Sequence, residues 1–267
     1  MLGIQMDVKD KIIVVTGAGN GIGKALTARF VEEGARCVVA ADIDGGNARL
    51  TADAYGCRAS ATDVANEADV KALIDNTEKD IGPIDLFCSN AGVARGANEQ
   101  SPDDEWQCSW DVNVMSHVYA ARHLAPRMIE RGGGYFLNTA SAAGLLNQVG
   151  GAAYGVTKHA AIGFGEWLAL TYKHKGIKVS MLCPQAVRTQ MTMTGGDAAG
   201  VKAAAADGMI EPKDVADCVI KGLADESFLI LPHAEVATYM QRKTTDYDRW
   251  INGMNRLHRS LTGEPDA

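Results

Sequence analysis

Residues 11–23 of this chain read KIIVVTGAGNGIG, and this stretch decides the fold. Its first six residues are mostly β-branched, which predicts a short buried strand. Glycines follow at every second position from Gly17 to Gly23, and a helical pattern starts near Gly21. Glycine permits the tight backbone turn that a strand needs to pass directly into a helix. The stretch therefore predicts the first strand–turn–helix unit of a parallel sheet.

The same alternation of apolar strand and helix continues along the chain. We expect strands at residues 11–16, 36–41, 57–61, 84–88, 135–139, 178–183 and 228–231. We expect helices at residues 21–33, 44–55, 66–80, 102–131, 151–175 and 212–224. The strands are continuously hydrophobic, which predicts a parallel sheet that helices cover on both faces. The predicted fold is α/β and doubly wound, a Rossmann-type fold of about seven parallel strands.

Length and composition limit the class of protein further. The 267 residues carry a net charge of −7, which argues against a nucleic-acid partner. No linker interrupts the alternation, so we expect one domain over residues 1–267, with a C-terminal extension at about 233–267. No signal peptide or membrane-length apolar run is visible, so we expect a cytoplasmic protein without a membrane partner. The six cysteines form no C-x-x-C pair, which predicts reduced thiols and no metal site.

The glycine turn and an acid after the second strand together indicate a dinucleotide site. The turn lies where a helix N-terminus would receive a pyrophosphate. Asp42 ends the second strand, where a carboxylate can accept hydrogen bonds from adenosine ribose hydroxyls and repel a 2′-phosphate. Asn20 occupies a turn position where a basic residue could otherwise meet that phosphate. The pattern predicts NAD rather than NADP as the cofactor.

Tyr154 and Lys158 are the candidate reacting groups. They are four residues apart at the start of a predicted helix and so share one of its faces. An ammonium beside a phenol, together with the cation of an oxidised nicotinamide ring, favours the phenolate and suits the tyrosine to proton transfer. Ser141 and Asn90 follow the carboxyl ends of two predicted strands, where doubly wound sheets bind ligands. Asn113 lies within the preceding helix.

These motifs, in this order, resemble the classical short-chain dehydrogenase/reductase family. The resemblance covers about residues 8–231 and rests on TGAGNGIG at 16–23, Asp63-Val64, NAG at 90–92, Asn113, Ser141 and YGVTK at 154–158. It implies that Tyr154 is the general acid/base and that Lys158 binds the nicotinamide ribose and lowers the pKa of Tyr154. It also implies that Ser141 bonds the substrate oxygen and that Asn113 holds a water in a proton relay.

The resemblance also implies a set of cofactor contacts along the carboxyl edge of the sheet. The predicted set is Gly17, Asn20, Gly21, Ile22, Gly23, Asp42, Asp63, Val64, Asn90, Ala91, Gly92, Tyr154, Lys158, Pro184, Val187 and Thr189. The chain departs from the family after the sixth strand, where Gln185 replaces a usual glycine. We expect Gln185 either to crowd the nicotinamide site or to place an amide in the substrate pocket.

The expected substrate is a mostly hydrophobic secondary alcohol or ketone. Apolar residues are predicted to wall its pocket, namely Leu145, Leu146, Val149, Met191, Met193, Met209 and Ile210. Residues 190–210 contain Gly195, Gly196 and Gly200 and are predicted to form a lid. Arg95 and Arg188 are the only nearby bases, and both are expected to be solvated. The apolar stripe of the extension is expected to pack on the body or on a partner subunit rather than to line the pocket.

Two alternative functions and one assembly remain open from the sequence. An NADPH-dependent carbonyl or 3-oxoacyl reductase is the first alternative, which Asp42 disfavours. A catalytically silent NAD-binding regulator is the second, although the chain has all four residues of the tetrad. The helices at 102–131 and 151–175 carry more apolar and small residues than one sheet face needs. The resemblance implies that such a pair forms a homo-oligomeric contact, in a tetramer or else a dimer.

Overall fold

The computed structural model describes residues 6–194 and 199–265. They form a seven-stranded parallel sheet in the order β3-β2-β1-β4-β5-β6-β7. The strands are β1 (Ile12–Thr16), β2 (Cys37–Asp42), β3 (Arg58–Ala61), β4 (Leu86–Ser89), β5 (Gly134–Thr139), β6 (Ile177–Leu182) and β7 (Leu229–Ile230). The predicted doubly wound fold is confirmed, although β7 is only two residues long instead of four. The order reverses between β1 and β4, which is where such sheets bind ligands.

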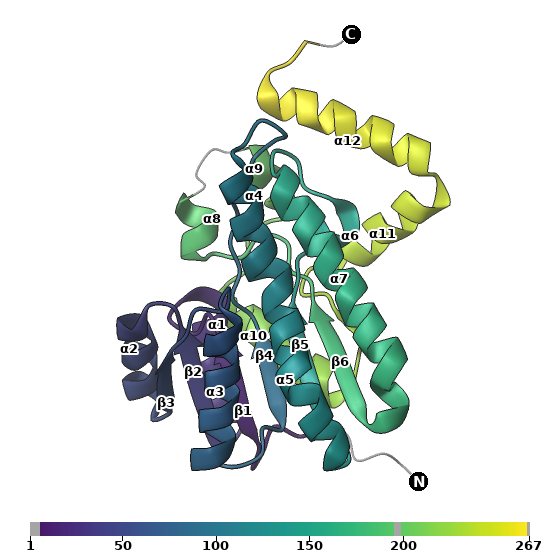
Figure 1. Cartoon of the computed structure of the whole chain (residues 1–267). Helices are drawn as coiled ribbons and strands as arrows, with labels where there is room; N and C mark the ends of the chain where they lie inside the picture. Colours follow the sequence, from purple (N-terminus) through teal and green to yellow (C-terminus); the bar gives the residue numbers. More distant parts are fainter. Residues whose placement is uncertain (1–5, 195–198, 266–267) are drawn as a thin grey trace.

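Helices cover both faces of the sheet and create two hydrophobic cores. One face carries α1 (Gly21–Glu32), α2 (Gly45–Tyr55) and α10 (Pro212–Ala224). The other carries α3 (Glu67–Asp80), α5 (Ser116–Glu130) and α7 (Ala152–Tyr172), which stand in front of the strands in Figure 1. Leu26 and Phe30 of α1 are fully buried in the first core, and Ile74 and Leu124 in the second. Burying such side chains stabilises the fold by about 1.5–3 kcal/mol each.

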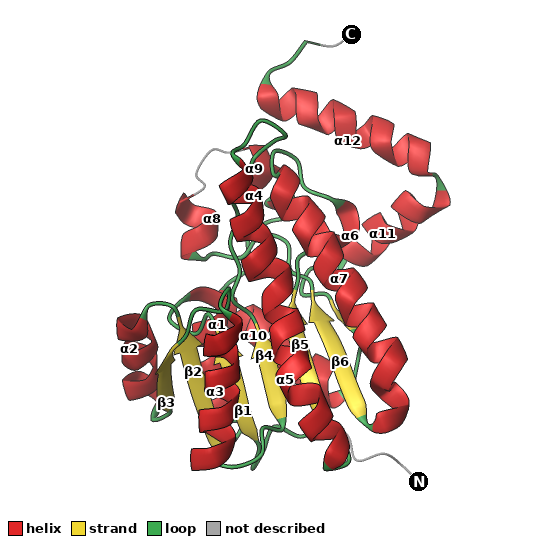
Figure 2. Cartoon of the chain, viewed as in Figure 1, coloured by secondary structure: helices red, strands yellow, loops and turns green. Residues whose placement is uncertain are grey.

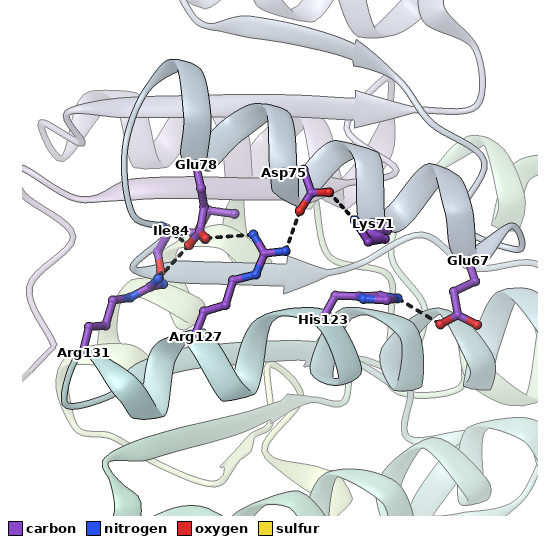
Figure 3. A network of polar contacts seen from close by, with 8 residues as sticks. All are labelled: Glu67, Lys71, Asp75, Glu78, Ile84, His123, Arg127 and Arg131. Carbon is purple, nitrogen blue, oxygen red and sulfur yellow. Dashed lines mark hydrogen bonds and ion pairs between the residues drawn. The ribbon is translucent and has the colours of Figure 1, made fainter.

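Arginines on α5 tie this helix to α3 along the outside of the sheet. Arg127 bonds Asp75 at 2.5 Å and Glu78 at 3.1 Å, and Arg131 bonds Glu78 at 2.7 Å. Figure 3 shows these side chains bridging the two helices. Hydrogen bonds from Lys71 and Arg127 lower the pKa of Asp75 to about 2. These ion pairs hold α3 and α5 parallel to each other, below the carboxyl ends of the strands.

The helix expected at residues 102–131 is present but is not uniform. It consists of α4 (Asp103–Trp110), a π-helical segment (Asp111–Met115) and α5. A π-helical turn widens the backbone spiral and is common at functional sites. Apolar periodicity does not signal it, because both helix types keep their apolar residues on the inward face. Asn113 stands in the middle of this segment.

The part of the molecule beyond the carboxyl ends of the strands contains helices and loops, as Figure 2 shows. Besides α4, its helices include α6 (Ala143–Leu146), α8 (Gln190–Thr194), α9 (Ala199–Ala204), α11 (Glu235–Thr245) and α12 (Tyr247–Thr262). The predicted lid includes α8 and α9, while its residues 195–198, with Gly195 and Gly196, lie outside the described residues. Within the described ranges, no helix combines the length and apolar character needed to span a membrane.

Candidate active site

The glycine turn after β1 lies directly against the chain that leaves β4. Gly17 has a φ of +65°, and a Cβ on it would lie 2.8 Å from the Cα of Ala91. The Thr16 hydroxyl accepts hydrogen bonds from the amides of Asn90 at 3.0 Å and Ala91 at 3.2 Å. The Asn90 side chain returns a hydrogen bond to the carbonyl of Thr16 at 3.0 Å. The two strand ends at the switch point are thus locked together.

No side chain caps the N-terminus of α1, which directly follows this turn. Its N-cap residue Asn20 makes no side-chain capping bond, and the first turn holds no acid. In α2 the Asp44 side chain accepts hydrogen bonds from two amides of the first turn. Free amides at a helix N-terminus, together with the helix dipole, form a site for an anion. The α1 terminus is therefore available for a pyrophosphate.

Asp42 holds the same turn from the end of β2. Its Oδ2 accepts a hydrogen bond from the Gly19 amide at 2.8 Å, and its Oδ1 accepts one from the Asp44 amide at 3.0 Å. The side chain is 9% exposed and faces the cavity beside the turn. The sequence indicated Asp42 as a ligand residue but not as the group that fixes the glycine turn. A carboxylate has enough lone pairs to serve the turn and a ribose together.

A cavity of about 350 Å³, here called the glycine cleft, lies along these strand ends. Every residue predicted to contact the cofactor lines it, from the turn at Gly17 to Thr189. Gln185 and Met191, which were expected near the substrate, line it too, and the structure adds residues that the sequence did not mark, namely Ile43, Thr62, Val93, Val112, Thr139, Ala140 and Thr192. Several of them follow strand ends, and this position is the signal that could have found them.

Lys158 and Tyr154 meet at one end of the cleft. The Lys158 ammonium is buried, donates a hydrogen bond to the Thr139 carbonyl at 3.1 Å and lies 5.6 Å from the centre of the Tyr154 ring. Burial lowers the pKa of Lys158 to about 8. Burial also raises the pKa of Tyr154, and a hydrogen bond with the Ser141 side chain opposes that rise. The lowering of the Tyr154 pKa by Lys158 that the resemblance implies stays a prediction.

Ser141 is oriented by backbone groups on both sides. Its hydroxyl donates to the Pro184 carbonyl at 3.3 Å and accepts from the Ala143 amide at 3.1 Å. Ser141 and Tyr154 line the glycine cleft and also the larger cavity beside it. Both cavities therefore share these two hydroxyls, together with Gln185 and Thr192.

Asn113 is brought close to this group but does not line the cleft. Its side-chain oxygen accepts from the Val93 amide at 3.0 Å. Its side-chain nitrogen donates to the Val93 carbonyl at 2.9 Å and to the Thr157 hydroxyl at 3.1 Å. The buried amide thus ties the π-helical segment to the β4 exit and to α7. Its role in holding a relay water stays a prediction.

A second cavity of about 510 Å³, here called the apolar cavity, opens from Ser141 and Tyr154. Three of the predicted wall residues line it, namely Leu146, Val149 and Met191, whereas Leu145, Met193, Met209 and Ile210 do not. The C-terminal extension supplies further walls through Tyr239, Trp250, Met254 and Leu257. The expectation that the extension stays outside the pocket is therefore wrong. Its helical stripe was visible in the sequence, but only the chain path brings it here.

The extension is anchored by its first helix. Val236 of α11 is fully buried and forms a small core with Ala142 and Leu146. The buried Lys243 ammonium donates to the Leu145 carbonyl at 2.7 Å. The expectation that the extension packs on the body is thus correct for α11. This anchoring fixes α11 beside α6, at the entrance of the apolar cavity.

Gln185 lies between the two cavities and lines both. Its amide N–H donates to Nδ1 of His233 at 3.2 Å, and its side-chain nitrogen donates to Asp207 at 3.3 Å. Gln185 is thus part of the wall of the glycine cleft and of the apolar cavity, and both expected effects stay predictions. Arg95 and Arg188 line neither cavity, and Arg188 is paired with Glu211 at 2.7 Å.

The residues of the glycine cleft fit a nicotinamide dinucleotide. The open N-terminus of α1 suits the pyrophosphate, and the acid at Asp42 suits a ribose. A Cβ on Gly92 would lie 3.3 Å from both the Lys158 ammonium and the Asn113 side-chain oxygen, so only glycine leaves that space free. Among the described residues, no group of three or more His, Cys, Asp or Glu side chains is arranged to hold a metal ion.

Comparison with known proteins agrees with this geometry. Residues 11–199 match the short chain dehydrogenase family. A 1-deoxy-11-beta-hydroxypentalenate dehydrogenase from Streptomyces exfoliatus is 32% identical over 256 residues, 92% of each chain. A cyclohexanol dehydrogenase from an Acinetobacter species is 30% identical over 228 residues, which are 83% of this chain and 90% of the relative.

A solved structure extends the likeness to the whole architecture. A short chain dehydrogenase/reductase from Burkholderia phymatum, solved in complex with NAD, has a TM-score of 0.83 at 28% identity and covers 91% of this chain and 96% of its own. Members of this family bind a nicotinamide cofactor, and this solved structure holds NAD. The chain belongs to the short-chain dehydrogenase/reductase family, and it is an oxidoreductase.

Proposed function

We propose that the protein is an NAD-dependent dehydrogenase of mostly hydrophobic secondary alcohols, or a reductase of the matching ketones. The observation that carries this proposal is the apolar cavity, which opens on the hydroxyls of Ser141 and Tyr154 beside the glycine cleft. The two relatives described above are named for hydroxylated compounds, hydroxypentalenate and cyclohexanol, which supports an alcohol substrate here.

Ser141 and Tyr154 would perform the proton chemistry. In alcohol oxidation the Tyr154 phenolate takes the hydroxyl proton, and in ketone reduction the phenol returns it to the carbonyl oxygen. The Ser141 hydroxyl holds the same substrate oxygen, which fixes the carbon toward the glycine cleft. A nicotinamide ring bound in the cleft would accept or donate the hydride.

Lys158 would act between the cofactor and the two hydroxyls of Ser141 and Tyr154. Its ammonium is buried within hydrogen-bond distance of the Thr139 carbonyl and close to Gly92, where the cleft narrows. From there it would bind ribose hydroxyls and hold the cofactor in register with Tyr154. Its positive charge would favour the phenolate, against the burial that raises the pKa of Tyr154.

NAD is proposed over NADP from the charges that face the cleft. Asp42 and Asp63 line it, and among the described lining residues Lys158 is the only base. Lys158 lies at the Tyr154 end, whereas Asp42 lies beside the glycine turn. A 2′-phosphate at that turn would meet a carboxylate and no cation. Phosphate groups bind well only where cations or free amides compensate their charge.

Residues 190–210 are proposed to close over bound substrate. Helices α8 and α9 bury none of their residues, and Met191 and Met193 are exposed. The Gln148 side chain holds α9 through one bond to the Gly200 carbonyl at 2.8 Å. Hydrogen exchange in this segment should slow when NAD and substrate are both bound. Equal exchange in the free and the bound enzyme would show a fixed wall.

A homo-oligomer is proposed from the outer side of α4 and α7. Trp110, Val156, Trp167 and Leu170 are all at least 41% exposed there, a cost that burial in an interface would remove. Light scattering at micromolar concentration tests the tetramer, or the dimer, against a monomer.

Steady-state turnover tests the function itself. Cyclohexanol and larger cyclic secondary alcohols are assayed with NAD and with NADP. We expect kcat/KM to be highest for apolar alcohols with NAD. A small polyol turned over better than every apolar alcohol would contradict the proposed pocket. The six cysteines are free, which agrees with the cytoplasmic location that we also propose and that cell fractionation would test.

A further inference from the structure

The walls of the apolar cavity carry two charged side chains among the described residues, Asp207 and Arg242. The remaining walls are apolar, small or amide side chains, apart from the hydroxyls of Ser141, Tyr154, Thr192 and Tyr239. A substrate in this cavity is therefore selected by its apolar skeleton and by what these two charges require. Asp207 and Arg242 differ in the partners that the protein offers them.

Asp207 already has its partners within the protein. The Tyr239 hydroxyl donates to its two oxygens at 2.9 and 3.1 Å, and the Gln185 side chain donates to one of them at 3.3 Å. The Asp207 carboxylate raises the pKa of Tyr239, so the phenol stays a donor. Asp207 thus joins the lid segment to α11 and to the β6 exit, and these bonds satisfy it.

Arg242 is in the opposite situation. Its guanidinium carbon lies 5.7 Å from the centre of the Tyr239 ring, and within residues 6–194 and 199–265 no acid lies within ion-pair distance of it. Arg127 and Arg131 of the α3–α5 network, in contrast, have carboxylate partners at 2.5–3.1 Å. A guanidinium keeps its charge at all working pH values and binds a carboxylate through two parallel hydrogen bonds.

Arg242 is an exposed residue of α11 that a ligand can reach. Lys243, the next residue, is buried and bonded to the Leu145 carbonyl, while Arg242 faces the cavity. The ring of Tyr239 supports one side of Arg242 and is itself held by Asp207. The planar guanidinium loses less freedom per hydrogen bond than a flexible ammonium would. The geometry therefore favours an anionic ligand group at the α11 wall.

We propose that the natural substrate is an apolar hydroxy or oxo acid whose carboxylate binds Arg242. This inference rests on the proposed function, since it places the reacting carbon at Ser141 and Tyr154. The apolar walls Leu146, Val149, Trp250 and Met254 lie around the skeleton that separates the two polar ends. Charged hydrogen bonds of this kind contribute about 1.5–3 kcal/mol, or roughly 10- to 100-fold in affinity.

Three ketones of similar length test this proposal with NADH and the whole enzyme, namely 9-oxodecanoate, its methyl ester and 2-decanone. We expect kcat/KM for the acid to exceed that for the ester by roughly 10- to 100-fold, mostly through KM. In Arg242→Gln the preference should disappear, and Arg242→Lys should keep part of it. Arg249→Gln, an exposed arginine on α12 that does not line the cavity, should behave as wild type.

Binding provides a readout that does not depend on turnover. Titration calorimetry of the wild-type enzyme and of Arg242→Gln, both saturated with NAD, which cannot reduce a ketone, compares 9-oxodecanoate with its ester. Tighter binding of the acid that is lost in Arg242→Gln supports the proposal. Equal binding or turnover of acid and ester, or an unchanged preference in Arg242→Gln, overturns it. Absence of turnover for all three ketones with both NADH and NADPH overturns the proposed function instead, while calorimetry still decides the role of Arg242.

Discussion

The glycine cleft and the apolar cavity meet at Ser141 and Tyr154 but are built in different ways. The cleft is lined mostly by residues that follow strand ends, with glycines that let the chain approach a ligand and one acid, Asp42, that fixes the turn. The apolar cavity consists of side chains from α6, the lid segment, α11 and α12. A backbone site suits a ligand that never changes, whereas side chains allow the substrate to differ between relatives.

The substitution Tyr154→Phe acts at the border and should have the largest effect. It removes the proton-transfer group, so we expect kcat/KM to fall by about 10²–10⁴-fold or more. NAD binding should stay within a few-fold of wild type, because the ring that lines the cleft is kept. Stopped-flow kinetics and fluorescence titration with NADH measure the two. Substantial residual activity would remove Tyr154 from the mechanism.

Lys158→Met should show that burying the Lys158 ammonium in the cleft lowers the stability of the folded protein. The folded protein lowers the pKa of Lys158 from 10.5 to about 8, so below pH 8 it must bury an ammonium. Stability should therefore rise with pH between about 8 and 10.5, where the unfolded chain binds more protons. Lys158→Met removes this cost, on the order of 3 kcal/mol at pH 7, and flattens that rise.

Thermal unfolding at pH 7 and pH 9.5 measures this effect. The melting temperature of Lys158→Met should exceed that of wild type at pH 7, although its activity is lost. Lys175→Met, an exposed lysine shortly after α7, is the control and should change neither value. A lower melting temperature for Lys158→Met at pH 7 would show that the ammonium stabilises the fold.

Asp42→Ala should change the cofactor and leave the substrate site alone. The preference for NAD over NADP should fall by roughly 10- to 100-fold, because a charged acceptor worth about 1.5–3 kcal/mol is lost. The KM for the alcohol should not change. Asp53→Ala, an exposed acid on α2, is the control. Equal use of NAD and NADP by the wild type would contradict the role given to Asp42.

Trp250→Ala should change the substrate site and leave cofactor binding alone, and it should have the smallest effect of these substitutions. It removes one wall of the apolar cavity, so the KM for an apolar alcohol should rise by about 10-fold, since such walls contribute on the order of 1–3 kcal/mol. NAD binding should stay unchanged. Ile251→Ala, which is 54% exposed on the same helix, is the matched control. A shift in NAD affinity would show that the two cavities are coupled.

The sequence predicted the cleft almost completely, because its residues lie in short motifs at strand ends. The alternation of strands and helices places those ends on one edge of the sheet, so Gly17, Asp42, Asn90 and Tyr154 could be assigned to one site. The predicted strands differ from the observed ones by one or two residues at their ends. The π-helical segment around Asn113 was missed, since periodicity does not report the hydrogen-bond pattern.

The tertiary structure alone decided the apolar cavity and the charges around the phenol. Trp250 and Arg242 are about 100 residues from Ser141 along the chain, and no periodicity says where an extension folds back. The pKa of Tyr154 also depended on burial rather than on its spacing from Lys158. Motif spacing encodes local geometry and strand order, whereas desolvation and contacts between distant helices exist only once the whole chain has packed.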